Sequence, residues 1–300
     1  MSTGHSRMPL YATLGLMAVT AIWGSTFFLI KDLVGRMPVT DFLAVRFTVA
    51  ALAMLLLFLK PLLALGRREW GQGLALGLVY GIGQLLQTAG LAHTSASISG
   101  FVTGMYVVFT PLLGTVLLRQ RLPPVTWIAV LLAVGGLGLL ALHGLSISYG
   151  VWLTLIAAAL YGLHIVGLGL WSRPGSAFAL STVQMLAIAV VCLLATLPHG
   201  PKLPPDNAAW FAVIYMALAA GAGAMLMQTW AQAHLTATRA AIVMTLEPVF
   251  AAGFAVAAGQ DQLSWRMLVG GALVLGAMYL VELAPRRKDA VPIEARHHEV

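Results

Sequence analysis

Two charged side chains lie inside apolar stretches, and their types suit anion binding and proton transfer. Arg46 follows four apolar residues, 42–45, and an arginine in such a setting can anchor an anionic group or hold a gate. A structural Arg46 would instead pair with Asp41 or with carbonyl groups at a helix end, or extend its side chain to the nearest aqueous surface. The sequence leaves both interpretations open.

Glu247 lies directly before Pro248 within another apolar stretch. Pro248 cannot donate a backbone hydrogen bond, so a helix bends there and frees carbonyl groups. A carboxyl group at such a bend could exchange protons and couple transport to a proton gradient, or could brace the bend by pairing with a basic group or a hydroxyl. Glu247, Pro248 and the first-half proline Pro111 are therefore candidate coupling or gating residues.

Other polar and aromatic residues recur at helical spacing. Gln84 and Gln87 are three residues apart, so they share a helix face. Any one such residue could simply form an interhelical hydrogen bond worth roughly 0.6 kcal/mol. As a set they favour a cavity for an amphipathic solute, because otherwise many polar groups would face lipid. The candidate substrate-binding residues are Trp23, Thr26, Arg46, Gln84, Gln87, Tyr106, Tyr161, His164, Gln184 and Gln228.

The composition indicates which elements position these residues. Hydrophobic residues make up 60% of the 300-residue chain and charged residues 9%, with a mean hydropathy of +0.90. Soluble proteins carry about 25% charged residues, so the composition excludes an ordinary soluble domain. A single cysteine, Cys192, excludes an intramolecular disulfide. We expect an all-α integral membrane protein.

Apolar runs of the length that crosses a bilayer follow one another along the chain. A helix needs about 20 apolar residues to cross the hydrocarbon layer, and barrel strands would alternate polar and apolar residues over about 10. The first run could be mistaken for a secretory signal, but no clear cleavage site follows it. We predict ten transmembrane helices at 10–30, 39–59, 70–91, 97–118, 125–142, 149–171, 177–197, 208–231, 238–258 and 265–283.

The basic residues predict the orientation of these helices. With the N-terminus inside, twelve of the 17 Lys and Arg residues fall on the cytoplasmic side and four outside. This bias follows the positive-inside rule, so we expect a multi-pass inner-membrane protein with both termini in the cytoplasm. The net charge of +7 is explained by these loops and by a basic tail near anionic lipid, and no nucleic-acid partner is expected.

An internal repeat relates the two halves. Gln87-Thr88 is echoed 141 residues later by Gln228-Thr229; in the same register Tyr106 matches Glu247 and, at a spacing of 138, Arg46 matches Gln184. Five helices per half would insert the second half with inverted topology, which allows two states that open to opposite sides. We expect repeats at 1–145 and 146–284 and a polar cytoplasmic tail at 285–300.

Three short motifs carry a family resemblance. Residues 21–28 (AIWGSTFF) with Lys31, residues 42–47 (FLAVRF) and residues 246–251 (LEPVFA) resemble the EamA family of the drug/metabolite transporter superfamily. The resemblance extends over 10–283 and implies two inverted five-helix repeats that export a metabolite or amino acid. One departure is Pro111, which lies four residues beyond the position matching Pro248, so the two halves are expected to bend differently.

These observations favour a secondary transporter that exports a small metabolite or amino acid by alternating access. A uniporter or channel-like facilitator remains an alternative, and a membrane-embedded enzyme or sensor is a further one. An enzyme would concentrate a nucleophile, acid pair or metal set at one interface, and the sequence shows no such pattern, no P-loop and no metal-ligand spacing. The expected partners are the solute and membrane lipid, a homodimer stays open, and no cofactor is expected.

Overall fold

The computed structural model describes residues 8–118, 124–143, 146–173, 175–198, 200–232 and 243–283, which are almost entirely helical. A pair of two-residue antiparallel strands, β1 and β2, lies between the sixth and seventh helices. The elements are α1 (Met8–Leu33), α2 (Val39–Leu63), α3 (Arg67–Ala92), α4 (Ala96–Gly104), α5 (Tyr106–Leu118), α6 (Pro124–Ala141), β1 (Leu142–His143), β2 (Ser146–Ile147), α7 (Tyr149–Trp171), α8 (Ala177–Leu194), α9 (Asn207–Tyr215), the π-helix η1 (Met216–Gly223), α10 (Ala224–Gln232), α12 (Glu247–Ala257) and α13 (Trp265–Leu283).

Seven segments within the described residues are long and apolar enough to cross a bilayer. They are α1, α2, α3, α4 with α5, α7, α8, and α9 through α10. Three shorter apolar helices span Pro124–Leu140, Glu247–Ala257 and Trp265–Leu280. The predicted all-α, multi-pass membrane protein is thus confirmed, whereas ten crossings stay a prediction. Part of the ninth predicted run, 238–258, lies in 233–242, outside the described residues.

The surface and the interior have the polarity expected of a protein in lipid. Large apolar side chains face outward: Leu56 is 84% exposed and Phe211 77%. In contrast, Arg46, Gln184 and Glu247 are at most 6% exposed. Soluble proteins bury apolar groups and leave charges in water, so this reversed arrangement places lipid outside and polar chemistry inside.

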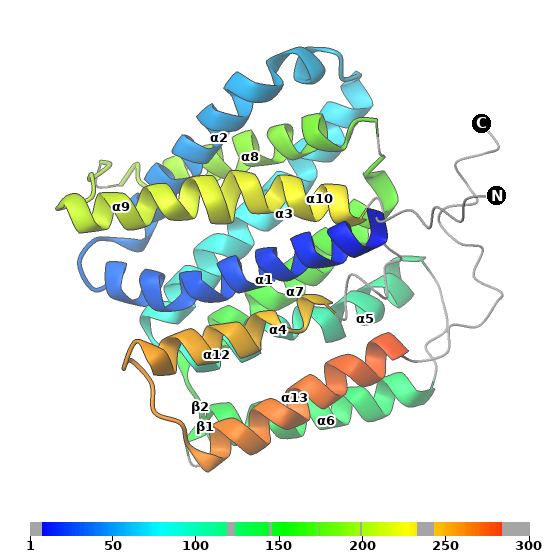
Figure 1. The fold of residues 1–300 in the computed structure, drawn as a ribbon, viewed down its shortest axis with the longest axis vertical. Helices are drawn as coiled ribbons and strands as arrows, with labels where there is room; N and C mark the ends of the chain where they lie inside the picture. Colours follow the sequence, from blue (N-terminus) through cyan, green and yellow to red (C-terminus); the bar gives the residue numbers. More distant parts are fainter. Residues whose placement is uncertain are drawn as a thin grey trace.

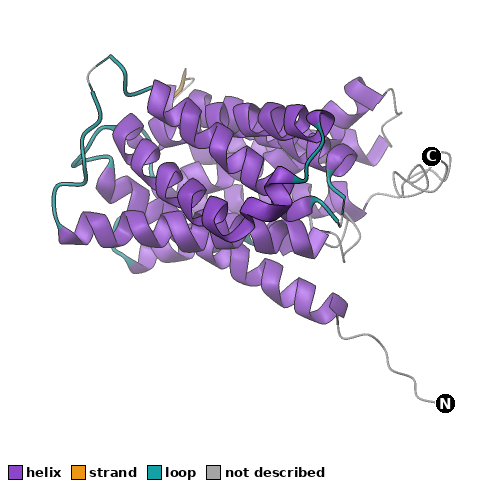
Figure 2. Cartoon of the chain, turned by 90° about the horizontal axis from the view of Figure 1, so that it is seen from above, coloured by secondary structure: helices purple, strands orange, loops and turns teal. Residues whose placement is uncertain are grey.

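The helices run along a common direction with connecting loops at their ends, as Figure 2 shows. The main helix contacts join the first half of the chain to the second: α3 packs on α7, α2 on α8, α1 on α12, and α6 on α13. Figure 1 shows α13 alongside α6 and α1 beside α12. Neither half therefore forms a separate bundle, and any site between these helices draws residues from both.

The interruption of the fourth span differs from the prediction based on Pro111. Helix α4 ends before Met105, and α5 begins at Tyr106 and contains Pro111 within it. In the second half, a turn at 245–246 directly precedes Glu247 and α12. The two breaks thus fall at matching positions of the repeat, beside Tyr106 and Glu247, because Pro111 is accommodated inside its helix.

Close packing of α6 on α13 makes a testable difference between two adjacent glycines. A Cβ added at Gly136 would lie 2.7 Å from the Gly270 carbonyl oxygen, whereas one added at Gly135 would meet nothing within 4 Å. Gly136→Ala should therefore lower the free energy of unfolding by about 1–3 kcal/mol, because a backbone atom cannot rotate away. Gly135→Ala should raise it by about 0.5–1 kcal/mol through helix propensity.

Unfolding of both variants in detergent, followed by loss of helical signal, compares them directly. If Gly136→Ala is as stable as Gly135→Ala, the two helices do not approach as closely as described.

Candidate functional site

A cavity lies among helices from both halves of the chain. Like small-molecule sites, it combines an apolar wall with a few oriented polar groups. The residues that line it are Trp23, Thr26, Phe27, Ile30, Arg46, Tyr80, Gln84, Gln87, Thr103, Tyr106, Tyr161, His164, Ile165, Gln228, Met244 and Glu247.

Helix α1 contributes one wall, and its tryptophan is fixed by the irregular helix η1. The Trp23 Nε1–H donates to the Ala220 carbonyl oxygen at 2.9 Å. In η1 the Ala224 amide bonds five residues back, to Ala219, so the π-helical winding leaves the Ala220 carbonyl available for Trp23. The indole is therefore held in place at the cavity wall. Thr26 bonds back to the Trp23 carbonyl at 2.7 Å.

A chain of hydrogen bonds crosses the cavity between α3, α4 and α7. Gln84 donates to the Tyr161 hydroxyl at 2.7 Å, and Tyr161 donates to the Gln87 oxygen at 2.8 Å. Gln87 in turn donates to the Thr103 hydroxyl at 3.0 Å. Both glutamines lie on one face of α3 because they are three residues apart. The network fixes the orientation of amide and hydroxyl groups that a solute would meet.

A second polar pair joins α7 to α8. His164 Nε2 lies 2.7 Å from the Gln184 side-chain oxygen, and both side chains are buried. Gln184 is not among the residues that line the cavity, so it positions the imidazole from behind. Tyr80 packs against His164 with ring centroids 5.0 Å apart and against Tyr161 at 5.2 Å. His164 is thus oriented by an amide on one side and an aromatic ring on the other.

Glu247 begins α12 and faces the matching residue of the other half. The Tyr106 hydroxyl donates to Glu247 Oε2 at 3.1 Å. Pro248 occupies the first turn of α12, where a missing amide proton costs nothing. Pro248 and Pro111 do not line the cavity; they shape the helices that carry Glu247 and Tyr106. The sequence gives two interpretations of Glu247, proton exchange and bracing of the bend. The contact with a hydroxyl is of the kind that bracing requires, and proton exchange stays a prediction.

Arg46 is 5% exposed and faces the cavity. It lies seven residues into α2, about 10 Å along the axis at 1.5 Å per residue. Its guanidinium stacks near the rings of Phe47 and Phe42, at 4.9 and 5.9 Å from their centroids. No ion pair joins Arg46 to another described residue, so the expected alternative of an Arg46–Asp41 pair is not seen there. Extension to the outer surface is excluded by the burial of Arg46.

The structure brings together nine of the ten candidate substrate-binding residues, all except Gln184. Their role in binding stays a prediction. Sequence reasoning missed the polar or polarizable lining residues Tyr80, Thr103 and Met244 and the apolar ones Phe27, Ile30 and Ile165. Tyr80 precedes Gln84 by four residues, so the helical period already placed it on the same face. Thr103 and Met244 carried no comparable signal. Among the described residues no three His, Cys, Asp or Glu side chains group as a metal site would.

A family model, a curated relative and a solved structure are each similar to this chain. The model of the EamA-like transporter family matches residues 10–142 and again 148–283. An uncharacterized transporter of Archaeoglobus fulgidus is 31% identical over 274 residues, which cover 91% of this chain and 86% of that protein. A crystal structure of a protein with 19% identity shares the fold, with a TM-score of 0.65 over 90% of this chain and 96% of the other. The two family matches cover nearly the whole apolar part of the chain. The chain therefore belongs to the EamA-like transporter family.

Proposed function

We propose that this membrane transporter exports a small metabolite or amino acid by alternating access, with the central cavity as its solute site. The observation that carries the proposal is a buried polar cavity inside an apolar bundle, lined from both halves of the chain. Polar groups within a membrane are costly and usually mark a solute or ion pathway. Membership of a transporter family favours this role over that of an enzyme.

The helix contacts support two inverted repeats of five crossings each. If the halves exchange, α1 corresponds to α7, and α4 with α5 corresponds to α12. The contact of α1 with α12 should then have a partner in a contact of α7 with α4 and α5, and both are present. Likewise, α3 on α7 corresponds to α10 on α1. Such exchange symmetry is what an inverted-repeat transporter uses to switch between its two states.

The topology that we propose keeps the predicted limits, with repeats at 1–145 and 146–284, a tail at 285–300 and cytoplasmic termini in the inner membrane. The start of α1 and the end of α13 lie at the same end of the bundle (Figure 1), which agrees with an even number of crossings. Of the twelve basic residues on which the orientation rests, eight lie outside the described residues: Arg7, Arg119, Arg121, Arg239, Arg286, Arg287, Lys288 and Arg296.

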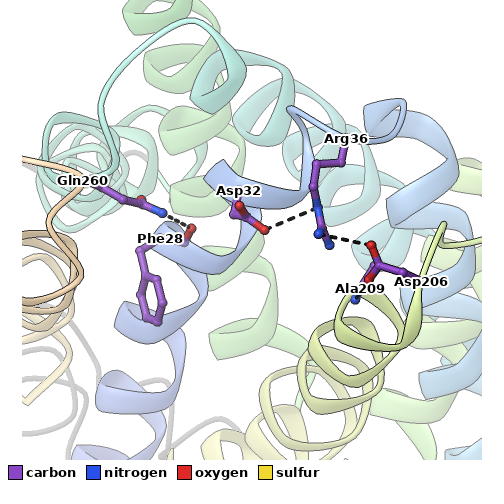
Figure 3. Close-up of polar contacts among 6 residues, drawn as sticks. All are labelled: Phe28, Asp32, Arg36, Asp206, Ala209 and Gln260. Atoms are coloured by element: carbon purple, nitrogen blue, oxygen red, sulfur yellow. Dashed lines mark hydrogen bonds and ion pairs between the residues drawn. The ribbon is translucent and has the colours of Figure 1, made fainter.

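A polar cluster links connectors at the opposite end of the bundle, as Figure 3 shows. Arg36, after α1, lies 3.5 Å from Asp32 and 3.3 Å from Asp206, whose other oxygen caps α9 at the Ala209 amide. Gln260, after α12, donates to the Phe28 carbonyl of α1 at 3.0 Å. These contacts tie connectors of both halves together. Alternating access requires this end to separate when the other closes.

Flux measurements on the purified chain in liposomes test the proposal. A panel of amino acids and small metabolites, each measured with and without a pH gradient, should include a solute that accumulates against its own gradient. Solute-loaded vesicles should also accelerate uptake of the same labelled solute, because alternating access exchanges solutes through one site. Flux that only dissipates gradients, without this exchange, would favour the channel-like facilitator instead. No flux of any panel member above empty vesicles counts against a transporter of these solutes.

A further inference from the structure

We propose that Arg46 binds a single negatively charged group of the solute, the carboxylate of a small organic molecule in the central cavity. This assignment rests on the proposed function, because it gives a chemical class to the solute of that same cavity. The observation behind it is a buried guanidinium that faces an open cavity without a carboxylate partner.

The described residues around Arg46 do not neutralise its charge, so a counter-charge has to come from a solute in the cavity. Arg46 is 5% exposed, and its Nε has no hydrogen-bond partner among the residues that the structure describes. Within the described part of the chain, the rings of Phe42 and Phe47 lie beside its guanidinium, and no ion pair includes it. A guanidinium carries five donors, and a charge removed from water requires a counter-charge or strong hydrogen bonds.

The other charged residue of the cavity does not fill this role. Glu247 also lines the cavity, but its described side-chain contact is with the Tyr106 hydroxyl at 3.1 Å. Arg46 belongs to α2 and Glu247 to α12, and no ion pair joins them in the part of the chain that the structure describes. Two opposite charges that share a cavity without pairing can each act on a different part of a solute.

The charge balance of the lining favours a carboxylate over a dianion. Among the described residues that line the cavity, Arg46 is the one Lys or Arg, and the imidazole of His164 is engaged by Gln184 at 2.7 Å. One guanidinium fork matches one carboxylate through two parallel hydrogen bonds. The second charge of a dianion would lie in the same cavity as Glu247 with no further cation. Trp23 and Tyr80 offer aromatic surface to the body of the solute.

Matched probes that differ only in the head group test this assignment. Benzoate, benzamide and benzylamine have nearly the same shape and carry charges of −1, 0 and +1; 3-phenylpropionate and its amide and amine form a second set. We expect the full-length protein in neutral detergent to bind at least one carboxylate roughly tenfold more tightly than its amide and amine. Titration calorimetry measures this, and inorganic phosphate and phenyl phosphate should bind more weakly than that carboxylate.

Three variants complete the experiment. Arg46→Gln should abolish the preference for the carboxylate over the amide, and Arg46→Lys should retain only part of it, because an ammonium keeps the charge but not the fork. Arg68→Gln, which removes an exposed arginine at the start of α3, should leave the preference unchanged. If Arg46→Gln fails to fold, the partial loss of preference in Arg46→Lys and the comparison of carboxylate with amide on the unmodified protein still test the assignment.

Three results would overturn the assignment: amides that bind as well as carboxylates in both sets, no binding by any probe, or equally tight binding of phosphate. Flux of the bound carboxylate through liposomes separates this inference from the proposed function. Arg46-dependent binding without flux would support the site and contradict transport. Solute flux that is equal in the unmodified protein and Arg46→Gln would support transport and overturn the role of Arg46.

Discussion

Replacing Glu247 by glutamine should lower solute flux in proteoliposomes roughly tenfold or more and remove its dependence on a pH gradient. The carboxyl group is 6% exposed and lines the cavity beside Tyr106. Glutamine keeps the size of the side chain and can still accept the Tyr106 hydrogen bond, but it cannot take up or release a proton. The substitution therefore separates proton exchange from bracing of the helix end, the two roles that the sequence leaves open.

Tyr106→Phe is the matched control for Glu247→Gln. It removes the hydroxyl that donates to Glu247 at 3.1 Å and leaves the carboxyl group in place. A hydrogen bond to a charged group contributes about 1.5–3 kcal/mol, so flux should fall, but a pH gradient should still alter it. Unchanged flux and an unchanged pH profile in Glu247→Gln would show that Glu247 has no part in coupling.

The second large effect is expected at Lys31, which directly precedes Asp32 of the cluster in Figure 3. Its Nζ donates to the carbonyl oxygens of Leu91, Ala92 and Thr94 at 3.0, 3.2 and 2.7 Å. Leu91 and Ala92 end α3 and Thr94 follows its cap; at such a helix end, unsatisfied acceptors and the helix dipole attract a cation. Lys31→Met should lower the free energy of unfolding by about 2–3 kcal/mol, since it leaves several acceptors without a donor.

Lys31→Met should also favour the state that is open at this end, because the contact between α1 and the end of α3 is lost with it. A cysteine introduced at Thr103, in the cavity wall, reports this through its rate of labelling by a water-soluble maleimide. Cys192 is fully buried, so background labelling should be low. A shift of 1.4 kcal/mol between two states changes their ratio about tenfold, so the rate should rise about tenfold or more when the cavity opens to that side.

Arg36→Gln provides the comparison for Lys31→Met. The side chains of Arg36, Asp32 and Asp206 are 35%, 61% and 50% exposed, and ion pairs this open to solvent contribute about 0–1 kcal/mol. We therefore expect little change in stability or labelling, although Figure 3 shows Arg36 joining two connectors. If Arg36→Gln has the larger effect, the exposed ion pairs hold this end closed and Lys31 does not.

Much of the architecture follows from the sequence, because the length of an apolar run and the repeat register are local properties. The run predicted at 149–171 is the observed extent of α7, Tyr149–Trp171. The register that matches Tyr106 with Glu247 places each beside the corresponding break of its own half, and the structure joins the two side chains by a hydrogen bond. Polar residues in apolar runs must avoid lipid, so their gathering in one cavity was also predictable.

Only the tertiary structure decided which side chains meet, because this depends on how helices distant in sequence approach each other. Gly83 lets the Tyr161 ring lie against α3: a Cβ there would be 2.8 Å from the ring. Packing of this kind brings Tyr161 between Gln84 and Gln87 and places Gln184 behind His164. Arg46 shows the limit most clearly. Its charge and apolar setting are visible in the sequence, but its place in the cavity that Tyr80 and Glu247 also line depends on how α2 packs against helices from both halves.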